Sequence, residues 1–339
     1  MKLLLRSFGI SIGLTVVGLG YVLIARGIDA GFIALILAAI ELAFSFDNAV
    51  INAKVLVRLS PLWRTLFLSV GILIAIFGVR ALLPLLIVSL TAHLPLGSVA
   101  DLALNRPEKY AEALVAARPA ITAFGGAFLL MLSLHFFLAD RKVQWWKRFE
   151  APLARLEYWW LPPIITAAVI GLLALAPDNH DPRTALIAGV SGLFIYSAMN
   201  GGIVLLNALF ARESGTHQVG WAAFATFLYL EVLDASLSFD GVIGAFAITN
   251  SVVLIAIGLG IGAIWVRSLT VHMVRNRTLE AYRYLEHGAH YAIFVLAVTM
   301  LLAVIVEVPD VITGVLCLGL IAAAAITSRQ VVEEKSRHA

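Results

Sequence analysis

Five acidic residues interrupt long apolar segments of the chain: Glu41, Asp47, Glu231, Asp234 and Asp240. A charged side chain at the centre of a membrane helix costs about 2.5–3.5 kcal/mol on insertion scales, so five of them cost roughly 10–15 kcal/mol if nothing compensates them. Compensation comes from an opposite charge, a proton, a bound cation or a water-filled cavity. The five acids therefore predict a site for a cation or for protons.

Polar side chains extend each acidic segment along one helical face. Steps of three and four residues connect Glu41, Ser45, Asn48 and Asn52 in the first segment, and Glu231, Asp234 and Ser238 in the second. Carboxylate and amide oxygens are the ligands of hard or borderline divalent cations. We expect Mn²⁺ first, with Mg²⁺ or Ca²⁺ as alternatives; the chain has one cysteine, which argues against a thiolate site specialised for Cu(I).

The other two aspartates lie off these faces. Asp47 follows Glu41 by six residues, and Asp240 follows Asp234 by six. Either each helix unwinds at its Ser-Phe-Asp sequence, or each aspartate faces another partner. Gly241, with Gly244, favours unwinding in the second segment, where free backbone carbonyls would become ligands.

Four further polar residues of apolar segments could extend the ion path. Arg80 is the one basic residue that the sequence places well inside a span, and it could pair with one acid. Asn200 precedes two glycines and could supply an amide oxygen or a bond between helices. His287 and His290, beside Glu286, are candidates for a site where ions enter or for a proton relay.

The composition requires elements that lie in a membrane. Hydrophobic residues make up 61% of the chain and charged residues 13%, which excludes a water-soluble globule. Apolar runs predict an all-α, polytopic bundle of about ten spans, near residues 8–25, 30–53, 65–91, 119–139, 161–176, 184–210, 219–247, 250–268, 289–306 and 310–327. We expect the first run to be a retained helix and not a cleaved signal peptide.

Basic residues gather on one side of these spans, which predicts cytoplasmic N- and C-termini. The opposite side receives only Arg26, Arg106, Lys109, Arg118 and Arg183. We expect a short surface helix within 97–118 on that side. The stretch 144–160, rich in tryptophan and basic residues, is typical of the lipid headgroup zone.

An internal repeat relates the two acidic segments. Residues 41–50 read ELAFSFDNAV and residues 234–243 read DASLSFDGVI, so Glu41 aligns with Asp234 and Asn48 with Gly241. The span count makes the two copies antiparallel, as in an inverted 5+5 repeat of secondary transporters. The predicted repeats are residues 1–176 and 177–339.

The acidic motifs resemble those of the TerC family of bacterial integral membrane proteins, in a branch described as a domain of unknown function. The resemblance rests on residues 41–54 and 231–241, with Gly78-Val79-Arg80 and residues 285–291. It implies metal-ion transport across the bacterial inner membrane, with manganese export and tellurium resistance as family activities. By the matching positions, it implies that Glu41, Asp47, Asn48, Asp234 and Asp240 line the ion path.

Other functions remain open at this stage. The chain could be a membrane accessory protein for metal supply or stress resistance, or an exporter of a small cationic organic solute. Two intramembrane aspartates also suit an aspartyl protease, but the Gly-x-Gly-Asp signature is missing, and we expect no enzyme. We expect the bilayer and a metal ion as partners, and no nucleic acid; the sequence does not address the oligomeric state.

Overall fold

A computed structural model describes residues 2–210, 218–246, 248–249, 251–306 and 308–337. Over these residues the chain is helical, without a strand longer than an isolated bridge between Leu59 and Gln218. The helices are α1 (Lys2–Arg26), α2 (Ile28–Phe44), α3 (Phe46–Leu56), α4 (Pro61–Leu73), the π-helix η1 (Ile74–Leu82), α5 (Leu83–Thr91), α6 (Leu96–Asn105), α7 (Pro107–Ala116), α8 (Arg118–Phe137), α9 (Lys147–Ala154), α10 (Leu161–Ala174), α11 (Pro182–Phe210), α12 (Gly220–Phe246), α13 (Val252–Arg275), α14 (Thr278–Ala281), α15 (Leu285–Leu302) and α16 (Asp310–Arg337).

Many of these helices can cross a membrane. In the described part of the chain, seven are long and apolar enough, and two bent pairs, α2 with α3 and α5 with α6, raise the number to nine. Large apolar side chains face outward, with Ile24 90% and Leu175 83% exposed, which suits lipid and not water. The chain is a multi-pass membrane protein with an all-α fold, as the sequence predicts.

The predicted span at 65–91 is divided in the structure. It becomes α4, the π-helix η1 and α5, and Pro84 lies in the first turn of α5. Proline has no N–H to donate and its ring crowds the preceding turn, which favours a widened turn just before it. The segment at 97–118 holds two short helices, α6 and α7, and not the single one expected.

Two compact units share the chain. Unit 1 contains residues 1–49, 56–118 and 216–272, and unit 2 contains residues 50–55, 119–215 and 273–339. Each unit therefore draws segments from both halves of the sequence. The units are groups of contacting residues and not copies of a repeat, so the repeat boundary at 176 stays a prediction.

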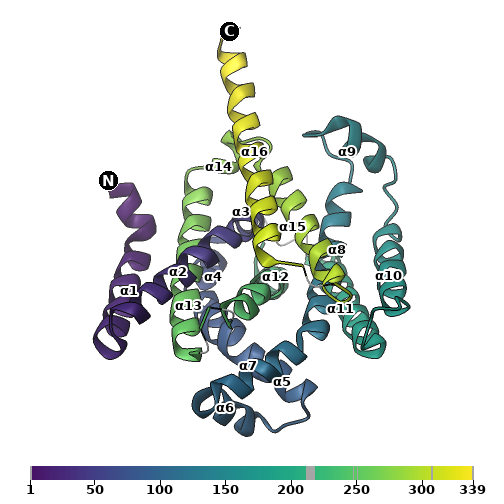
Figure 1. Cartoon of the computed structure of the whole chain (residues 1–339). Coiled ribbons are helices and arrows are strands. Elements are labelled where there is room, and N and C mark those ends of the chain that lie inside the picture. The colour runs from purple at the N-terminus through teal and green to yellow at the C-terminus, as the bar shows by residue number, and fades with distance from the viewer. Residues whose placement is uncertain (1, 211–217, 247, 250, 307, 338–339) are drawn as a thin grey trace. The chain divides into compact units, whose positions relative to one another are not determined.

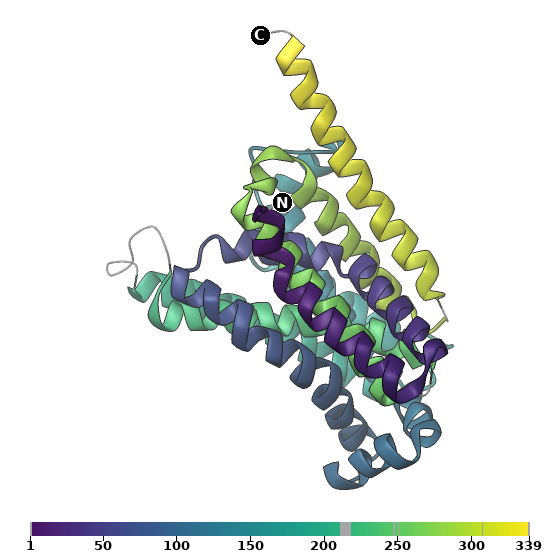
Figure 2. The ribbon, with the colours of Figure 1, turned by 90° about the vertical axis from the view of Figure 1, so that its left-hand side faces the viewer.

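In unit 1, small residues bring α13 directly against α2. A Cβ atom at Gly258 would lie 2.7 Å from the Leu37 Cβ, and one at Gly262 would lie 2.5 Å from the Glu41 Cβ. Glycines four residues apart let two membrane helices approach closely. On another side, α1 runs along α13 (Figure 2), where the Trp265 indole donates to the Thr15 hydroxyl at 2.9 Å. The α2–α13 contact therefore positions the stem of the Glu41 side chain against α13.

In unit 2, α8 is the most buried of the seven spans, with 78% of its 18-residue apolar window buried. A Cβ at Gly126 would meet the side chain of Leu301 on α15, and one at Gly288 would meet Ala324 on α16. Helices α15 and α16 lie side by side (Figure 1). Close contacts at glycine thus build both units.

Candidate metal centre

The first acidic motif lies at a break between two helices. Helix α2 ends at Phe44 and α3 begins at Phe46, with a bend of 53° between them. At the break, Ser45 has φ −96° and ψ 19°, outside regular helix geometry, and its hydroxyl donates to Glu41 Oε1 at 2.9 Å. The sequence leaves unwinding open for both motifs and favours it in the second because of its glycines; in the structure the motif without glycine is broken, whereas α12 continues through Gly241 and Gly244.

Buried polar groups line the α3 side of this break. Asp47 and Asn48 are 2% and 1% exposed. The Asp47 Oδ1 accepts the backbone N–H of Asn48 at 2.8 Å, and the Asn48 amide nitrogen donates to Asp234 Oδ1. The Asn48 Oδ1 has no hydrogen-bond partner. A buried acceptor without a donor is costly, and here it stands among carboxylates.

The two acidic motifs face one another within unit 1. Asn48 contacts Asp234, while the Glu41 Oε2 lies 3.0 Å from where a Cβ of Gly241 would be. As numbers rise from 41 to 48 along the first motif, its partners fall from 241 to 234, so the motifs cross antiparallel. In the sequence alignment, Glu41 matches Asp234 and Asn48 matches Gly241. In the structure the partners are exchanged: Glu41 lies against Gly241, and Asn48 contacts Asp234. Such exchanged contacts are those of a pseudo-two-fold axis.

Side-chain sizes complement each other across this crossing. The longer acid, Glu41, faces a glycine, and the shorter acid, Asp234, faces an asparagine. One contact thus joins a long side chain to none, and the other joins two shorter side chains of equal size. The second copy has Gly241 where the first has Asn48, and the missing side chain leaves room for Glu41.

Arg267 is the residue of this site that sequence reasoning missed. The prediction counted it among the basic residues of the cytoplasmic side, at the edge of a span ending at 268, but α13 continues to Arg275 and buries Arg267 to 3% exposure. Its guanidinium lies 3.2 Å from Glu231 Oε2 and 3.4 Å from Asp234 Oδ2. The statement that Arg80 is the one basic residue inside a span is therefore wrong. The apolar residues after Arg267, Leu269 and Val271, were the available signal.

Several predicted site residues are not joined to this cluster by the structure. The side chains of Asp240, Ser238 and Arg80 lie outside the described residues. Asn52 and Asn200 belong to unit 2; Asn52 is buried with an unpartnered Oδ1, and Asn200 is half-buried. Their roles as ligands stay predictions. Among the described residues, no three His, Cys, Asp or Glu side chains form a ready metal shell.

The predicted histidines lie in unit 2, in a separate polar group. His287 contacts Glu150 Oε1 through Nδ1 at 3.1 Å, and the Tyr291 hydroxyl donates to the same oxygen at 3.1 Å. His290 bonds the Glu286 carbonyl at 2.8 Å and stacks on Phe136, with ring centroids 3.6 Å apart.

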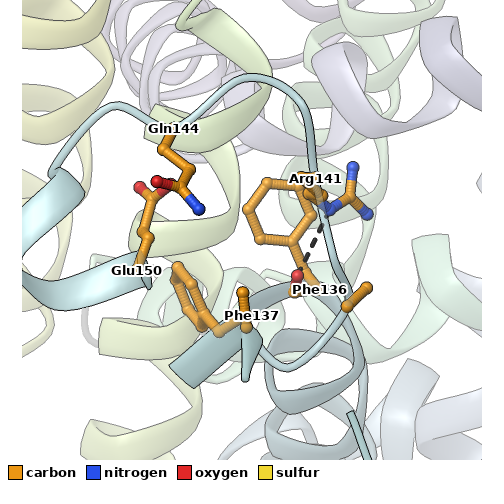
Figure 3. A pocket seen from close by; sticks show the side chains of 7 residues that line it. Phe136, Phe137, Arg141, Gln144 and Glu150 are labelled. Carbon is orange, nitrogen blue, oxygen red and sulfur yellow. Dashed lines mark hydrogen bonds between the residues drawn. The ribbon is translucent and has the colours of Figure 1, made fainter. Parts of the chain in front are cut away.

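Cations neutralise the second acid of unit 2. Glu286 pairs with Lys54 at 2.7 Å and with Arg141 at 3.0 Å. Arg141 also lies over the ring of Phe136 and donates to its carbonyl, beside a small pocket that Gln144 and Glu150 enter from the other side (Figure 3).

Glu150, which the sequence did not single out, holds α9 against α15. Burial favours the neutral acid, but the hydrogen bond and charge of His287 and the backbone N–H groups of Trp146 and Trp145 outweigh it and lower the pKa of Glu150 below its ordinary value. The carboxylate thus accepts hydrogen bonds from the segment just before α9 and from α15. Its partner His287 is 137 residues away, beyond the reach of local spacing.

A family described as protein of unknown function (DUF475) matches residues 46–336 of the chain. The chain belongs to this family. The DUF475 match begins at Phe46 and so includes Asp47, Asn48, the whole second motif and Arg267, while Glu41 precedes it. No curated protein and no solved structure matches the chain.

Proposed function

We propose that this protein transports divalent metal cations across a membrane through the buried carboxylates of unit 1, with Mn²⁺ export as its principal activity. The observation that carries the proposal is the Asn48 Oδ1, a buried acceptor without a partner, placed beside Asp47 and in contact with Asp234. A cation that accepts lone pairs from all three residues would satisfy the acceptor and the surplus negative charge together.

The ligand chemistry supports a hard or borderline divalent ion. Asp47, Asn48, Asp234 and Glu41 offer carboxylate and amide oxygens, which suit Mn²⁺, Mg²⁺ and Ca²⁺. The break at Ser45 adds helix-end carbonyls, the arrangement that discontinuous transporter helices use for cations. Carboxylates that release a metal ion can take up protons in its place, so protons are the natural counter-ion.

The location follows from charge distribution and resemblance. Basic residues favour one side of the spans, which supports cytoplasmic termini. The similarity of the acidic motifs to the TerC family supports the bacterial inner membrane. The antiparallel crossing of the two motifs supports alternating access around a site between related segments.

The test is Mn²⁺ flux into proteoliposomes that contain a Mn²⁺-quenched dye. We expect flux with the wild-type chain and at least a tenfold loss with Asp47→Asn or Asp234→Asn, since losing a ligand costs at least the 10–100-fold known for outer-shell partners. Glu280→Gln, which neutralises a carboxylate that is 71% exposed, is the matched control and should retain flux.

Two results would contradict transport. If flux is unchanged in both aspartate variants, these carboxylates do not take part in transport. Mn²⁺ bound at one site without any flux would instead favour the accessory role in metal supply.

A further inference from the structure

Arg267 is the one Lys or Arg side chain that is buried among the described residues. Its Nη1 donates to the Phe67 carbonyl at 2.9 Å, and its guanidinium carbon lies 3.9 Å from the centroid of the Phe67 ring. The remaining donors face Glu231 and Asp234. The charged group is therefore held by α4 and α12, and the Arg267 side chain is only 3% exposed.

The backbone of α4 is shaped to fit this ion pair. A Cβ at Gly71 would lie 2.5 Å from Glu231 Oε1 and 2.7 Å from Arg267 Nη1. Any side chain at this position would displace one of the two charges. The absence of a side chain at residue 71 lets α4 close over the pair, so the position of Arg267 is built by three helices.

Asp234 is shared between the arginine and the predicted metal ligands. Its Oδ2 faces Arg267 at 3.4 Å, and its Oδ1 accepts from Asn48. Glu231, by contrast, gives both oxygens to Arg267, at 3.2 Å each from Nη2. Two carboxylates, Glu231 and Asp234, contact the guanidinium. Its single charge can neutralise only part of their charge.

We propose that Arg267 is a tethered cation: its guanidinium pairs with Asp234 while the transported ion is absent, and it releases Asp234 when the ion binds. This inference rests on the proposed transport function and divides the roles of the two acids on α12. Glu231 retains the guanidinium, and Asp234 alternates between the guanidinium and the metal. An Arg side chain that competes for a ligand lowers metal affinity and promotes release, because the two cations repel one another at short range.

The experiment is calorimetric titration of the detergent-purified full chain with Mn²⁺. We expect Arg267→Gln to bind Mn²⁺ at least tenfold more tightly than the wild type, because Asp234 loses its competitor. Arg267→Lys keeps the charge and should stay within threefold of the wild type. Glu231→Gln leaves Asp234 as the main partner of Arg267 and should weaken binding at least tenfold.

Arg275→Gln is the matched control, because it removes the same charge from an exposed position at the end of the same helix. It should leave the affinity unchanged, which separates the local competition from overall charge. Circular dichroism and gel filtration check that each variant is folded. A purely structural role for Arg267 predicts lost folding or weaker binding, never tighter binding.

Each outcome decides between the two proposals. Wild-type binding together with unchanged or weaker binding in folded Arg267→Gln overturns the tethered cation and leaves transport standing. If Arg267→Gln does not fold, unchanged affinity in Glu231→Gln overturns it instead. Absence of Mn²⁺ binding in the wild type overturns the proposed function, and the tethered cation with it.

Discussion

The buried acids of the two units differ in how they are satisfied. In unit 2, Glu150 accepts hydrogen bonds from His287, Tyr291 and two backbone N–H groups, and Glu286 has two cationic partners. In unit 1, Asp47 accepts the backbone N–H of Asn48, and the neighbouring Asn48 Oδ1 has no partner. Both groups are buried, so burial alone does not identify a functional acid.

The difference lies in the compensation of charge. A buried pair that satisfies all its lone pairs holds two helices together, and removal of one member exposes an uncompensated charge. A buried acid without such partners reduces stability and is retained when function needs it. Neutralising Asp47 in unit 1 and Glu150 in unit 2 should therefore have opposite effects on stability.

The largest effect is expected for Glu150→Ala in unit 2. This change removes the acceptor of His287 and Tyr291 and should lower the free energy of unfolding by about 3–5 kcal/mol, as for other broken buried pairs. Thermal unfolding in detergent measures it, with the exposed Glu157→Ala within about 0.5 kcal/mol of the wild type as control. Loss of Mn²⁺ affinity without loss of stability would reverse the assignment of the two regions.

A smaller effect is expected where the motifs cross in unit 1. Gly241→Asn places a side chain against Glu41, whose Oε2 is 3.0 Å from the new Cβ, and should cost about 1–3 kcal/mol by overpacking. Adding Glu41→Asp recreates the Asn48–Asp234 arrangement and should recover most of the loss. Additive effects of the two changes in a double-mutant cycle would refute the pseudo-two-fold contact.

The third effect is small and of opposite sign. Asp47→Asn removes a buried charge, while its amide oxygen can still accept the Asn48 N–H. The variant should be more stable than the wild type by about 1 kcal/mol, as is common when a functional compromise is removed, and should no longer bind Mn²⁺. Destabilisation as large as that of Glu150→Ala would make Asp47 a structural acid.

The smallest effect is confined to acid pH. Because the folded-state pKa of Glu150 lies below its ordinary value of 4.5, its contribution to stability is complete above that value and is lost as the pH falls through the lowered pKa. We expect α9 to detach below about pH 4.5, seen as a change in the fluorescence of Trp145 and Trp146. The same transition in Glu150→Gln would assign it to another group.

The helical fold was predictable from the sequence because lipid requires long apolar runs, and all the predicted spans contain helix in the described residues. The sequence leaves unwinding open for both motifs, and glycine favours it only in the second, whereas the structure breaks the first motif at Ser45 and continues α12 through Gly241. Arg267 was missed because a charged residue near a span end was taken as a boundary. Asp240 lies among the side chains that the structure does not describe.

The glycines of α13 also have a mechanical consequence. At Gly258 and Gly262 the backbone of α13 lies directly against the side-chain stems of Leu37 and Glu41 on α2. A displacement of α13 would therefore push directly on the stem of Glu41. Arg267 lies five residues beyond Gly262, about 7.5 Å along the axis and on a different face. A rotation of α13 would therefore move the stem of Glu41 and, at the same time, the guanidinium that pairs with Glu231 and Asp234.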